Sequence, residues 1–316
     1  MSAYANTTQT IRAVMGKAGL YGAPPPQVVD FPVDAIQFSP LEPGASPLEL
    51  QSEGTLSSMT MLAPPGTLER RYAMALAISA VAPGSNFTAL APNNQGGTRL
   101  RKELQAFGCT VDEAARRHHR IVFCRRPMNV TGVEEALLDS GPQLVADLGL
   151  WSQPGVFSWD RIDPGTALLL RHLPALGGRG ADFGSGIGIL SRAVLESAMV
   201  EQITLIDIDR RAIDASKRNL DDARARFLWS DVRARNLGLG ELDFVVMNAP
   251  FHDAGAEDRT LPTSFVNRAV EVLRTGGVCW LTANRHLPYE AVMKPLFKQI
   301  DLTIETGGYK IYEAHK

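Results

Sequence analysis

The chain has 316 residues, of which 45% are hydrophobic and 21% charged, and its formal net charge at pH 7 is -2. This composition predicts a globular protein, and the length favours two domains over one. Because the net charge is near zero, the protein as a whole does not attract nucleic acid electrostatically. Any RNA contact must therefore use local patches of basic residues. Apolar stretches are too short to cross a bilayer, and the N-terminus has no secretory signal pattern. We therefore expect a soluble, cytoplasmic protein.

Three widely spaced cysteines, Cys109, Cys124 and Cys279, are the only ones in the chain. Their spacing and odd number fit neither a disulfide framework nor a clustered zinc site. We predict reduced, mostly buried thiols and no metal.

The first half of the chain alternates between helical and strand patterns. Apolar residues recur at helical spacing over 66–82, with Thr67 as the N-cap candidate and Pro83-Gly84 as the stop. The other elements predicted here are a strand over 87–90, a helix over 98–107 and a strand over 121–124. This alternation predicts an α/β module.

No regular element is predicted over 127–150, and Trp151-Ser152-Gln153-Pro154-Gly155 marks a domain boundary. We predict a first domain over 1–150 and a second over 151–316. In the second, Asp163 caps a helix that starts at Pro164 and ends near residue 172. The remaining predicted helices cover 190–198, 212–220, 265–273 and 288–299. The predicted strands cover 180–183, 203–208, 226–229, 242–247, 278–283, 302–305 and 310–313.

Seven strands that end in a hairpin predict a doubly wound sheet with a reversed last strand. Because the two halves share one α/β rhythm, an internal duplication is expected. The first half lacks a glycine-rich turn after a strand, so we predict that its module has lost a ligand site.

A glycine-rich turn follows the predicted strand over 180–183. It spells Asp182-Phe183-Gly184-Ser185-Gly186-Ile187-Gly188. Missing side chains let a ligand press against the backbone and against helix-terminal amides, so Asp182, Gly184, Ser185, Gly186 and Gly188 are predicted to bind a cofactor. Ile189 stands where the third glycine of the dinucleotide fingerprint would be, which weakens an oxidoreductase interpretation.

Two further acidic residues end successive strands. Asp207 is expected to accept hydrogen bonds from ribose hydroxyls, and Asp231 from an adenine amino group, because ligands bind beyond the carboxyl edge of such sheets. Their neighbours Ile208 and Val232 complete this predicted pocket. A single such Asp could equally cap a turn, but three beside a glycine turn favour a ligand.

The sequence Asn248-Ala249-Pro250-Phe251 directly follows an apolar strand. An aromatic amino group is a poor nucleophile because its lone pair is delocalised into the ring. Asn248 Oδ1 and the Ala249 carbonyl could accept its two N–H hydrogens and free the lone pair for attack, while Phe251 stacks on the base. We predict these four residues as catalytic. The alternative is a proline turn with a core aromatic.

These motifs resemble the cofactor and amino-methylation motifs of class I S-adenosylmethionine-dependent methyltransferases. That family's second motif normally contains Asn-Pro-Pro-Phe or Asn-Pro-Pro-Tyr, so Ala249 is a departure that keeps only the backbone carbonyl. The resemblance implies S-adenosylmethionine as the methyl donor.

A narrower resemblance rests on 155–158, Asp163-x-Gly165-Thr166, 251–253, 283–289 and 306–312. These segments are similar to ribosomal RNA guanine 2-amino methyltransferases, most of all the small-subunit enzyme. The resemblance implies two tandem methyltransferase-like domains, the first without cofactor. It also implies a guanine acceptor in ribosomal RNA and Phe157, Asp163 and Thr166 at the methionine end of the cofactor. His252 and Asp253 would act in acid/base catalysis or only order the loop.

The densest basic run is 116–120, continued by Arg125-Arg126. It could grip RNA phosphates, although a solvated helix end is an equal alternative. A second basic patch comprises Arg99, Arg101 and Lys102. We expect a monomer. The alternatives to an rRNA methyltransferase are an amino-methyltransferase acting on protein glutamine or DNA adenine, and a non-catalytic RNA-binding relic of the fold.

Overall fold

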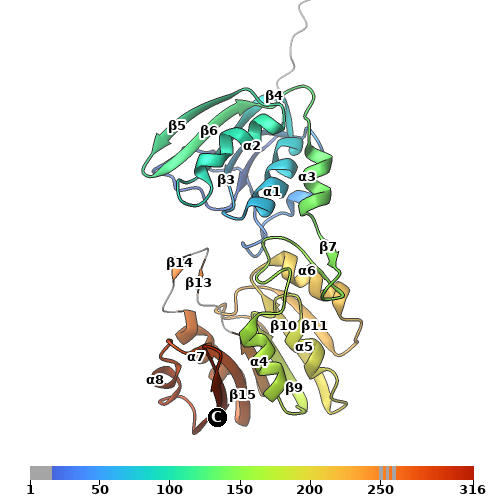
Figure 1. Ribbon diagram of the computed structural model, residues 1–316, viewed down its shortest axis with the longest axis vertical. Coiled ribbons are helices and arrows are strands. Elements are labelled where there is room, and N and C mark those ends of the chain that lie inside the picture. Colours follow the sequence, from blue (N-terminus) through green and yellow to red (C-terminus); the bar gives the residue numbers. More distant parts are fainter. Residues whose placement is uncertain (1–15, 249–251, 254–255, 258–260) are drawn as a thin grey trace, which may run out of the picture. The chain divides into compact units, whose positions relative to one another are not determined.

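The computed structural model describes residues 16–248, 252–253, 256–257 and 261–316, and it divides into two compact units (Figure 1). One unit runs to Ser39 and resumes over Ala45–Asp139. The other comprises Pro40–Gly44 and Ser140–Lys316. Each unit is a sheet flanked by helices, as the alternating pattern of the sequence predicts.

The first unit holds a six-stranded sheet in the order β2-β1-β3-β4-β6-β5. The first four strands in this order run parallel to one another. Strand β6 pairs antiparallel with β4, and β5 pairs antiparallel with β6. The strands are β1 (Ala18–Tyr21), β2 (Ile36–Phe38), β3 (Leu56–Leu62), β4 (Val81–Pro92), β5 (Val111–Arg116) and β6 (His119–Arg125). The helices are α1 (Thr67–Ala80), α2 (Leu100–Ala106) and α3 (Val133–Ser140), with 3₁₀ turns at Leu48–Leu50 and Gly97–Arg99.

Several sequence predictions in this unit were wrong. The alternative of a helix end at the basic run is also excluded, because Arg116 and the residues after it form a β-hairpin in which Arg117 and His118 adopt left-handed φ angles of 47° and 62°. Almost every β5 side chain is exposed, so its strand shows no apolar alternation. Gly66, not Thr67, is the N-cap of α1. The helix α3 lies where no element was predicted.

The second unit holds a seven-stranded sheet in the order β11-β10-β9-β12-β15-β17-β16, in which β17 is antiparallel to both neighbours. The predicted sheet with a reversed last strand is confirmed. The strands are β9 (Gly178–Phe183), β10 (Val200–Asp207), β11 (Ala225–Trp229), β12 (Leu242–Asn248), β15 (Leu273–Asn284), β16 (Gln299–Thr306) and β17 (Tyr309–His315). Two short pairs lie outside this sheet: β7 (Gln143–Val145) with β8 (Leu150–Ser152), and β13 (His252–Asp253) with β14 (Ala256–Glu257).

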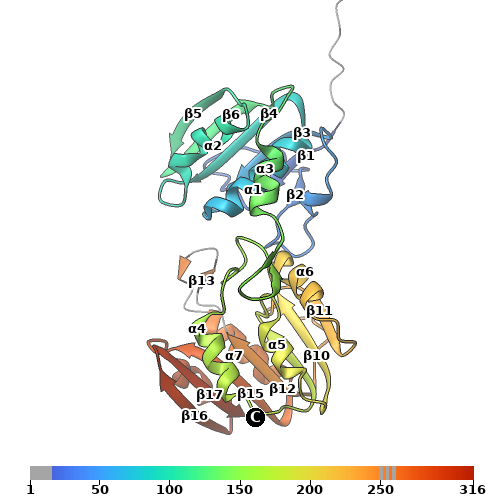
Figure 2. The same cartoon turned by 45° about the vertical axis from the view of Figure 1, so that its right-hand side comes forward.

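Helices cover both faces of this sheet, as Figures 1 and 2 show. They are α4 (Pro164–His172), α5 (Ile189–Val194), α6 (Arg210–Asn219), α7 (Leu261–Val272) and α8 (Tyr289–Met293). Both α5 and α8 end several residues earlier than predicted. Along β12, Phe244 and Val246 join the core under α4 and α5, whereas Val245 and Met247 join the core under α7 and α8. By this alternation, Asn248 faces the α4 side.

The strands inside the two sheets pair in equivalent registers, so positions in one sheet can be matched to positions in the other. In the second unit, Met247 pairs with Phe183 and Asn248 with Thr282, on the two sides of β12. In the first unit, Met61 pairs with Tyr21 and Leu62 with Leu90, on the two sides of β3. Strand β3 therefore corresponds to β12, and Leu62 stands at the position of Asn248. This correspondence supports a duplicated module whose first copy lacks the amide.

The predicted burial of the cysteines is confirmed for all three, and each carries a free thiol in the structure. Within the described part of the chain, no helix is long and apolar enough to cross a membrane.

Candidate active site

The glycine turn connects β9 to α5 through left-handed backbone. Gly184, Gly186 and Gly188 have φ angles of 69°, 53° and 88°, which L-residues with side chains rarely adopt. A Cβ placed on Gly186 would meet no atom within 4 Å, so the turn borders open space there. Gly188 serves as the N-cap of α5. The turn is therefore shaped to let a ligand approach the backbone at Gly186.

Asp182 lies under this turn and is fully buried. Its Oδ2 accepts a hydrogen bond of 2.7 Å from the Ser191 hydroxyl, and its Oδ1 has no partner among the described residues. Burial raises the pKa of Asp182 to about 7, despite the hydrogen bond from Ser191. The Ser185 hydroxyl is also buried without a partner in the described part of the chain. These orphaned polar atoms border the turn that the sequence predicts to hold a ligand.

Asp207, at the end of β10, binds the turn to its neighbouring strand. Its Oδ2 accepts the Gly186 N–H at 2.8 Å, and its Oδ1 accepts the Asp209 N–H at 2.8 Å. Burial raises the pKa of this carboxyl to about 6, although these hydrogen bonds favour the ionised form. A carboxylate offers about four acceptor positions, so two hydroxyl donors could still be received.

Asp231 has a partner that the sequence did not predict. Arg233 donates to it from its backbone N–H at 2.8 Å and from its guanidinium. Burial alone would raise the pKa of Asp231, but the Arg233 hydrogen bonds hold it below its ordinary value. Nearby, the Trp229 indole donates to the Ile208 carbonyl at 2.9 Å, and Val232 is buried. The role of Asp231 toward an adenine amino group stays a prediction.

Asn248 ends β12 on the α4 side of the sheet. Its Nδ2 donates to Asp163 Oδ2 and to Thr166 Oγ1, each at 2.9 Å. Asp163 is also the N-cap of α4, as predicted, and accepts the Thr166 N–H at 3.0 Å. The structure thus brings Asp163 and Thr166 to the amide, a contact that sequence reasoning missed. The sequence indicated only that Asp163 caps α4 and that Thr166 lies in the first turn of the same helix.

Among the remaining predicted site residues, Phe157 is described and its side chain is 71% exposed. Ala249, Pro250 and Phe251 lie outside the described residues. His252 and Asp253 form the short strand β13, in which His252 pairs with Glu257.

Comparison with known proteins assigns the fold and the family. A family model described as "Methyltransferase small domain" matches residues 147–313. The ribosomal RNA small subunit methyltransferase C of Shewanella halifaxensis is 30% identical over 275 residues, which is 85% of this chain and 80% of the relative. This chain belongs to that methyltransferase family. The Shewanella loihica relative of the same name is 29% identical over 280 residues, again 85% and 80% of the two chains.

Among solved structures, the T. thermophilus 16S rRNA N2 G1207 methyltransferase in complex with AdoMet and guanosine is similar over both units. The TM-score is 0.70 with 23% identity, covering 86% of this chain and 76% of that one. The tandem Rossmann-like architecture is therefore shared by the two proteins.

As a methyltransferase of this family, the enzyme uses S-adenosylmethionine, and the residues at the turn fit that cofactor. The space beside Gly186 admits a ligand against the backbone. The Asp207 carboxylate matches the donor character of ribose hydroxyls. The unpartnered Ser185 hydroxyl adds a hydrogen-bonding group at the same turn.

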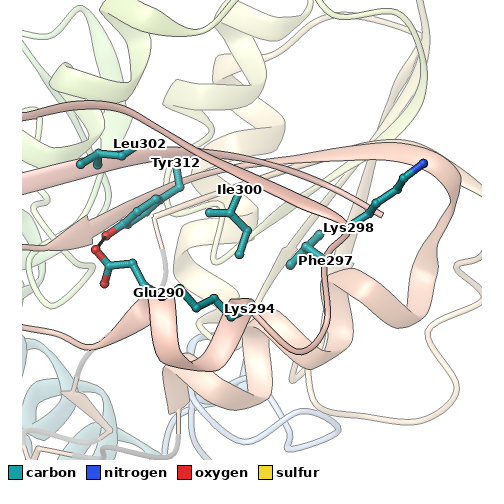
Figure 3. A pocket seen from close by; sticks show the side chains of 7 residues that line it. All are labelled: Glu290, Lys294, Phe297, Lys298, Ile300, Leu302 and Tyr312. Carbon is teal, nitrogen blue, oxygen red and sulfur yellow. Dashed lines mark hydrogen bonds between the residues drawn. The ribbon is translucent and has the colours of Figure 1, made fainter.

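A separate hollow lies between α8 and the β16–β17 hairpin (Figure 3). Its lining residues are Glu290, Lys294, Phe297, Lys298, Ile300, Leu302 and Tyr312. Lys310 donates to Glu290 Oε1 at 2.7 Å, and the Tyr312 hydroxyl donates to the same oxygen. Tyr312 packs in the core under α7 and α8, whereas Ile311 packs in the core under α4. The hollow is therefore on the opposite face of the sheet from Asn248.

Proposed function

We propose that this protein transfers a methyl group from S-adenosylmethionine to the exocyclic 2-amino group of a guanine in small-subunit ribosomal RNA. The observation that carries this proposal is the position of Asn248. It ends the strand next to β9, whose glycine turn borders open space, and both N–H groups of its amide are bound to α4. The Asn248 Oδ1 is thereby left to accept from a substrate amine.

For the proposed methyl transfer, the main task of the protein is to orient the amine toward the methyl group. When bound, S-adenosylmethionine would supply an electrophilic methyl group on a sulfonium, and the broken carbon–sulfur bond would leave its electron pair on the sulfur as a neutral thioether. Asn248 Oδ1 and the Ala249 carbonyl would accept the two amine hydrogens, draw the nitrogen toward sp³ geometry and direct its lone pair at the methyl group. The amine proton is lost after the bond forms, so no strong general base is needed. Pro250 and Phe251 would hold the planar base beside these acceptors.

The names of the similar proteins favour guanine over other planar amines as the methyl acceptor. Their name specifies small-subunit ribosomal RNA, and the T. thermophilus protein is described as acting at N2 of G1207. We propose the corresponding guanine as the acceptor here. Asp207 would hold the ribose of the cofactor, Asp231 its adenine, and Asp182 and the glycine turn its central part. Thr166 and Phe157, by the resemblance, would lie near its methionine end.

We further propose that the first unit recognises RNA and binds no cofactor. In place of Asn248 it carries Leu62, which offers no side-chain acceptor. The tip of its β5–β6 hairpin presents Arg116, Arg117 and His118, all exposed. Exposed guanidinium groups on a protruding hairpin suit contact with phosphates.

The test is nucleoside mass analysis of ribosomal RNA after incubation with the protein and S-adenosylmethionine. Assembled small subunits and naked RNA serve as substrates. We expect N2-methylguanosine with the wild type and a loss of at least 100-fold with Asn248→Ala, because the principal amine acceptor is removed. Calorimetry should show S-adenosylmethionine binding within about threefold of the wild type, since Asn248 only neighbours the cofactor turn.

A different methylated product would identify another planar amine as the acceptor. Full activity of Asn248→Ala would refute the role of this residue. A wild type that binds no S-adenosylmethionine would support the non-catalytic alternative.

A further inference from the structure

The Asn248 amide is held by two side chains from the start of α4. Asp163 Oδ2 accepts one Nδ2 hydrogen at 2.9 Å, and Thr166 Oγ1 accepts the other at 2.9 Å. Asp163 Oδ2 also accepts the Thr166 N–H at 3.0 Å, as the helix cap. The three residues therefore form one connected hydrogen-bond group that joins the end of β12 to the first turn of α4.

An asparagine amide has nearly the same shape in its two orientations, which exchange Oδ1 and Nδ2. Only one orientation presents an acceptor to a substrate amine. The turned orientation would aim N–H groups at the amine hydrogens. A carboxylate accepts hydrogen bonds and donates none, so Asp163 can be satisfied only by the Nδ2 end of Asn248. Its presence therefore selects the orientation that directs Oδ1 away from α4.

We propose that Asp163, assisted by Thr166, is a positioning residue that fixes the Asn248 amide with Oδ1 toward the substrate amine. This inference rests on the proposed function, because it assigns how the acceptor is oriented. Donation from Nδ2 to a carboxylate also polarises the amide and strengthens Oδ1 as an acceptor. The role differs from the contact with the cofactor that the family resemblance implies for Asp163.

The start of α4 is itself firmly placed. A Cβ on Gly165 would lie 2.8 Å from the Tyr309 ring, so only glycine lets this turn pack so closely on β17. Pro164 occupies the first turn of α4, where its missing N–H is not needed. Asp163 is thus carried by a segment whose position depends on the sheet that also carries Asn248.

The matched test compares Asp163→Asn with Asp160→Asn. Asn caps a helix as well as Asp does, so α4 should still form, but the new amide can face Asn248 with either end. We expect kcat for Asp163→Asn to fall about 10- to 100-fold, as for other partners that orient a reacting group. The KM for RNA and the S-adenosylmethionine affinity should stay within about twofold. Asp160, an exposed carboxylate paired with Arg161, is the control, and its variant should keep wild-type activity.

Two further measurements separate positioning from a general structural effect. In an Asn248→Ala background, Asp163→Asn should lower the residual rate by less than twofold, because no amide remains to be oriented. Independently of activity, the side-chain ¹⁵N–¹H₂ resonances of Asn248, assigned by their loss in Asn248→Ala, should shift in Asp163→Asn and in Thr166→Val. Thr166→Val covers the case in which Asp163→Asn does not fold.

The inference is overturned if Asp163→Asn weakens S-adenosylmethionine binding tenfold or more while kcat is kept, since Asp163 would then contact the cofactor. It is also overturned if the Asn248 side-chain resonances are the same in all three proteins. A wild type without guanine methylation would instead refute the proposed function. The resonance measurement would still test the orientation of the amide.

Discussion

Asp207 combines two roles in one carboxylate. It binds the Gly186 N–H and the Asp209 N–H and so shapes the turn. We propose that it also accepts hydrogen bonds from the ribose hydroxyls of the cofactor. Burial makes its charge unfavourable, which is why its pKa is raised to about 6. The same group therefore titrates much closer to neutral pH than an exposed Asp, and the ionised form is the one that accepts from hydroxyl donors.

We predict that S-adenosylmethionine affinity falls as the pH drops through about 6. Protonating Asp207 removes a charged acceptor, so calorimetry should give a dissociation constant about tenfold higher at pH 5 than at pH 7.5. Because this pKa is raised on folding, the contribution of Asp207 to stability is present below its ordinary value of 3.8 and is lost as the pH rises through 6. Titration of this group therefore does not unfold the protein at pH 5. The matched variant Asp207→Asn should bind weakly at both pH values, and equal wild-type affinities would contradict the prediction.

At the scale of elements, a buried ion pair joins α1 and α2 of the first unit. Arg70 of α1 is fully buried and donates to both carboxylate oxygens of Glu103 of α2, at 2.7 and 2.8 Å. It also donates to the carbonyls of Pro64 and Pro65, which follow β3. The Arg70 guanidinium therefore holds the segment after β3 against α1 and α2.

Glu103→Ala should destabilise the α1–α2 region by roughly 3 kcal/mol, because it leaves the Arg70 charge buried and unpaired. All four tryptophans lie in the second unit, so their fluorescence would miss this change. Hydrogen exchange of the α1 amides measures it directly. Glu113→Ala is the control, since Glu113 pairs with the half-exposed Arg101 and Arg120 and its loss should cost less than 1 kcal/mol. Unchanged protection of α1 in Glu103→Ala would show that the pair contributes little.

On the scale of the whole molecule, we propose that the first unit recognises RNA and the second transfers the methyl group. The overall charge of -2 gives no general attraction for nucleic acid, so binding must come from local clusters. The β5–β6 hairpin is the densest basic segment of the first unit, and Glu113 pairs with Arg120 at 3.2 Å on its flank. The tip residues extend beyond this pair.

Replacing both Arg116 and Arg117 with Gln should weaken RNA binding without altering S-adenosylmethionine affinity. Each lost phosphate contact lowers the slope of log K against log salt by about 1, so we expect a decrease of 1 to 2. Fluorescence anisotropy over a salt series provides the measurement. The exposed Arg226 of β11, in the second unit, offers a matched single control, Arg226→Gln. An unaltered salt slope in the double variant would exclude the hairpin from the RNA contact.

Much of the second unit was predictable because its signals are local. Buried parallel strands leave apolar runs, and the glycine turn needs left-handed backbone at three glycines. Asp207 and Asn248 are the last residues of the strands that place them. Parallel pairing then brings these strand ends to one edge without further information. The first unit was less predictable. Strands β1 and β2 are short, and β5 is exposed at the sheet edge, so none of these three strands leaves a periodic apolar pattern in the sequence.

The sequence by itself determined the fold class, the glycine turn and the place of the Asn248 amide at a strand end, since each depends on residues close together in the chain. Only the tertiary structure decided which partners those groups have. Asp163 and Asn248 are 85 residues apart, and Arg70 and Glu103 are 33 apart. Hydrogen bonds between remote side chains leave no periodicity in a single sequence. The orientation of the Asn248 amide follows from such a bond, so it became visible only once α4 was placed against the sheet.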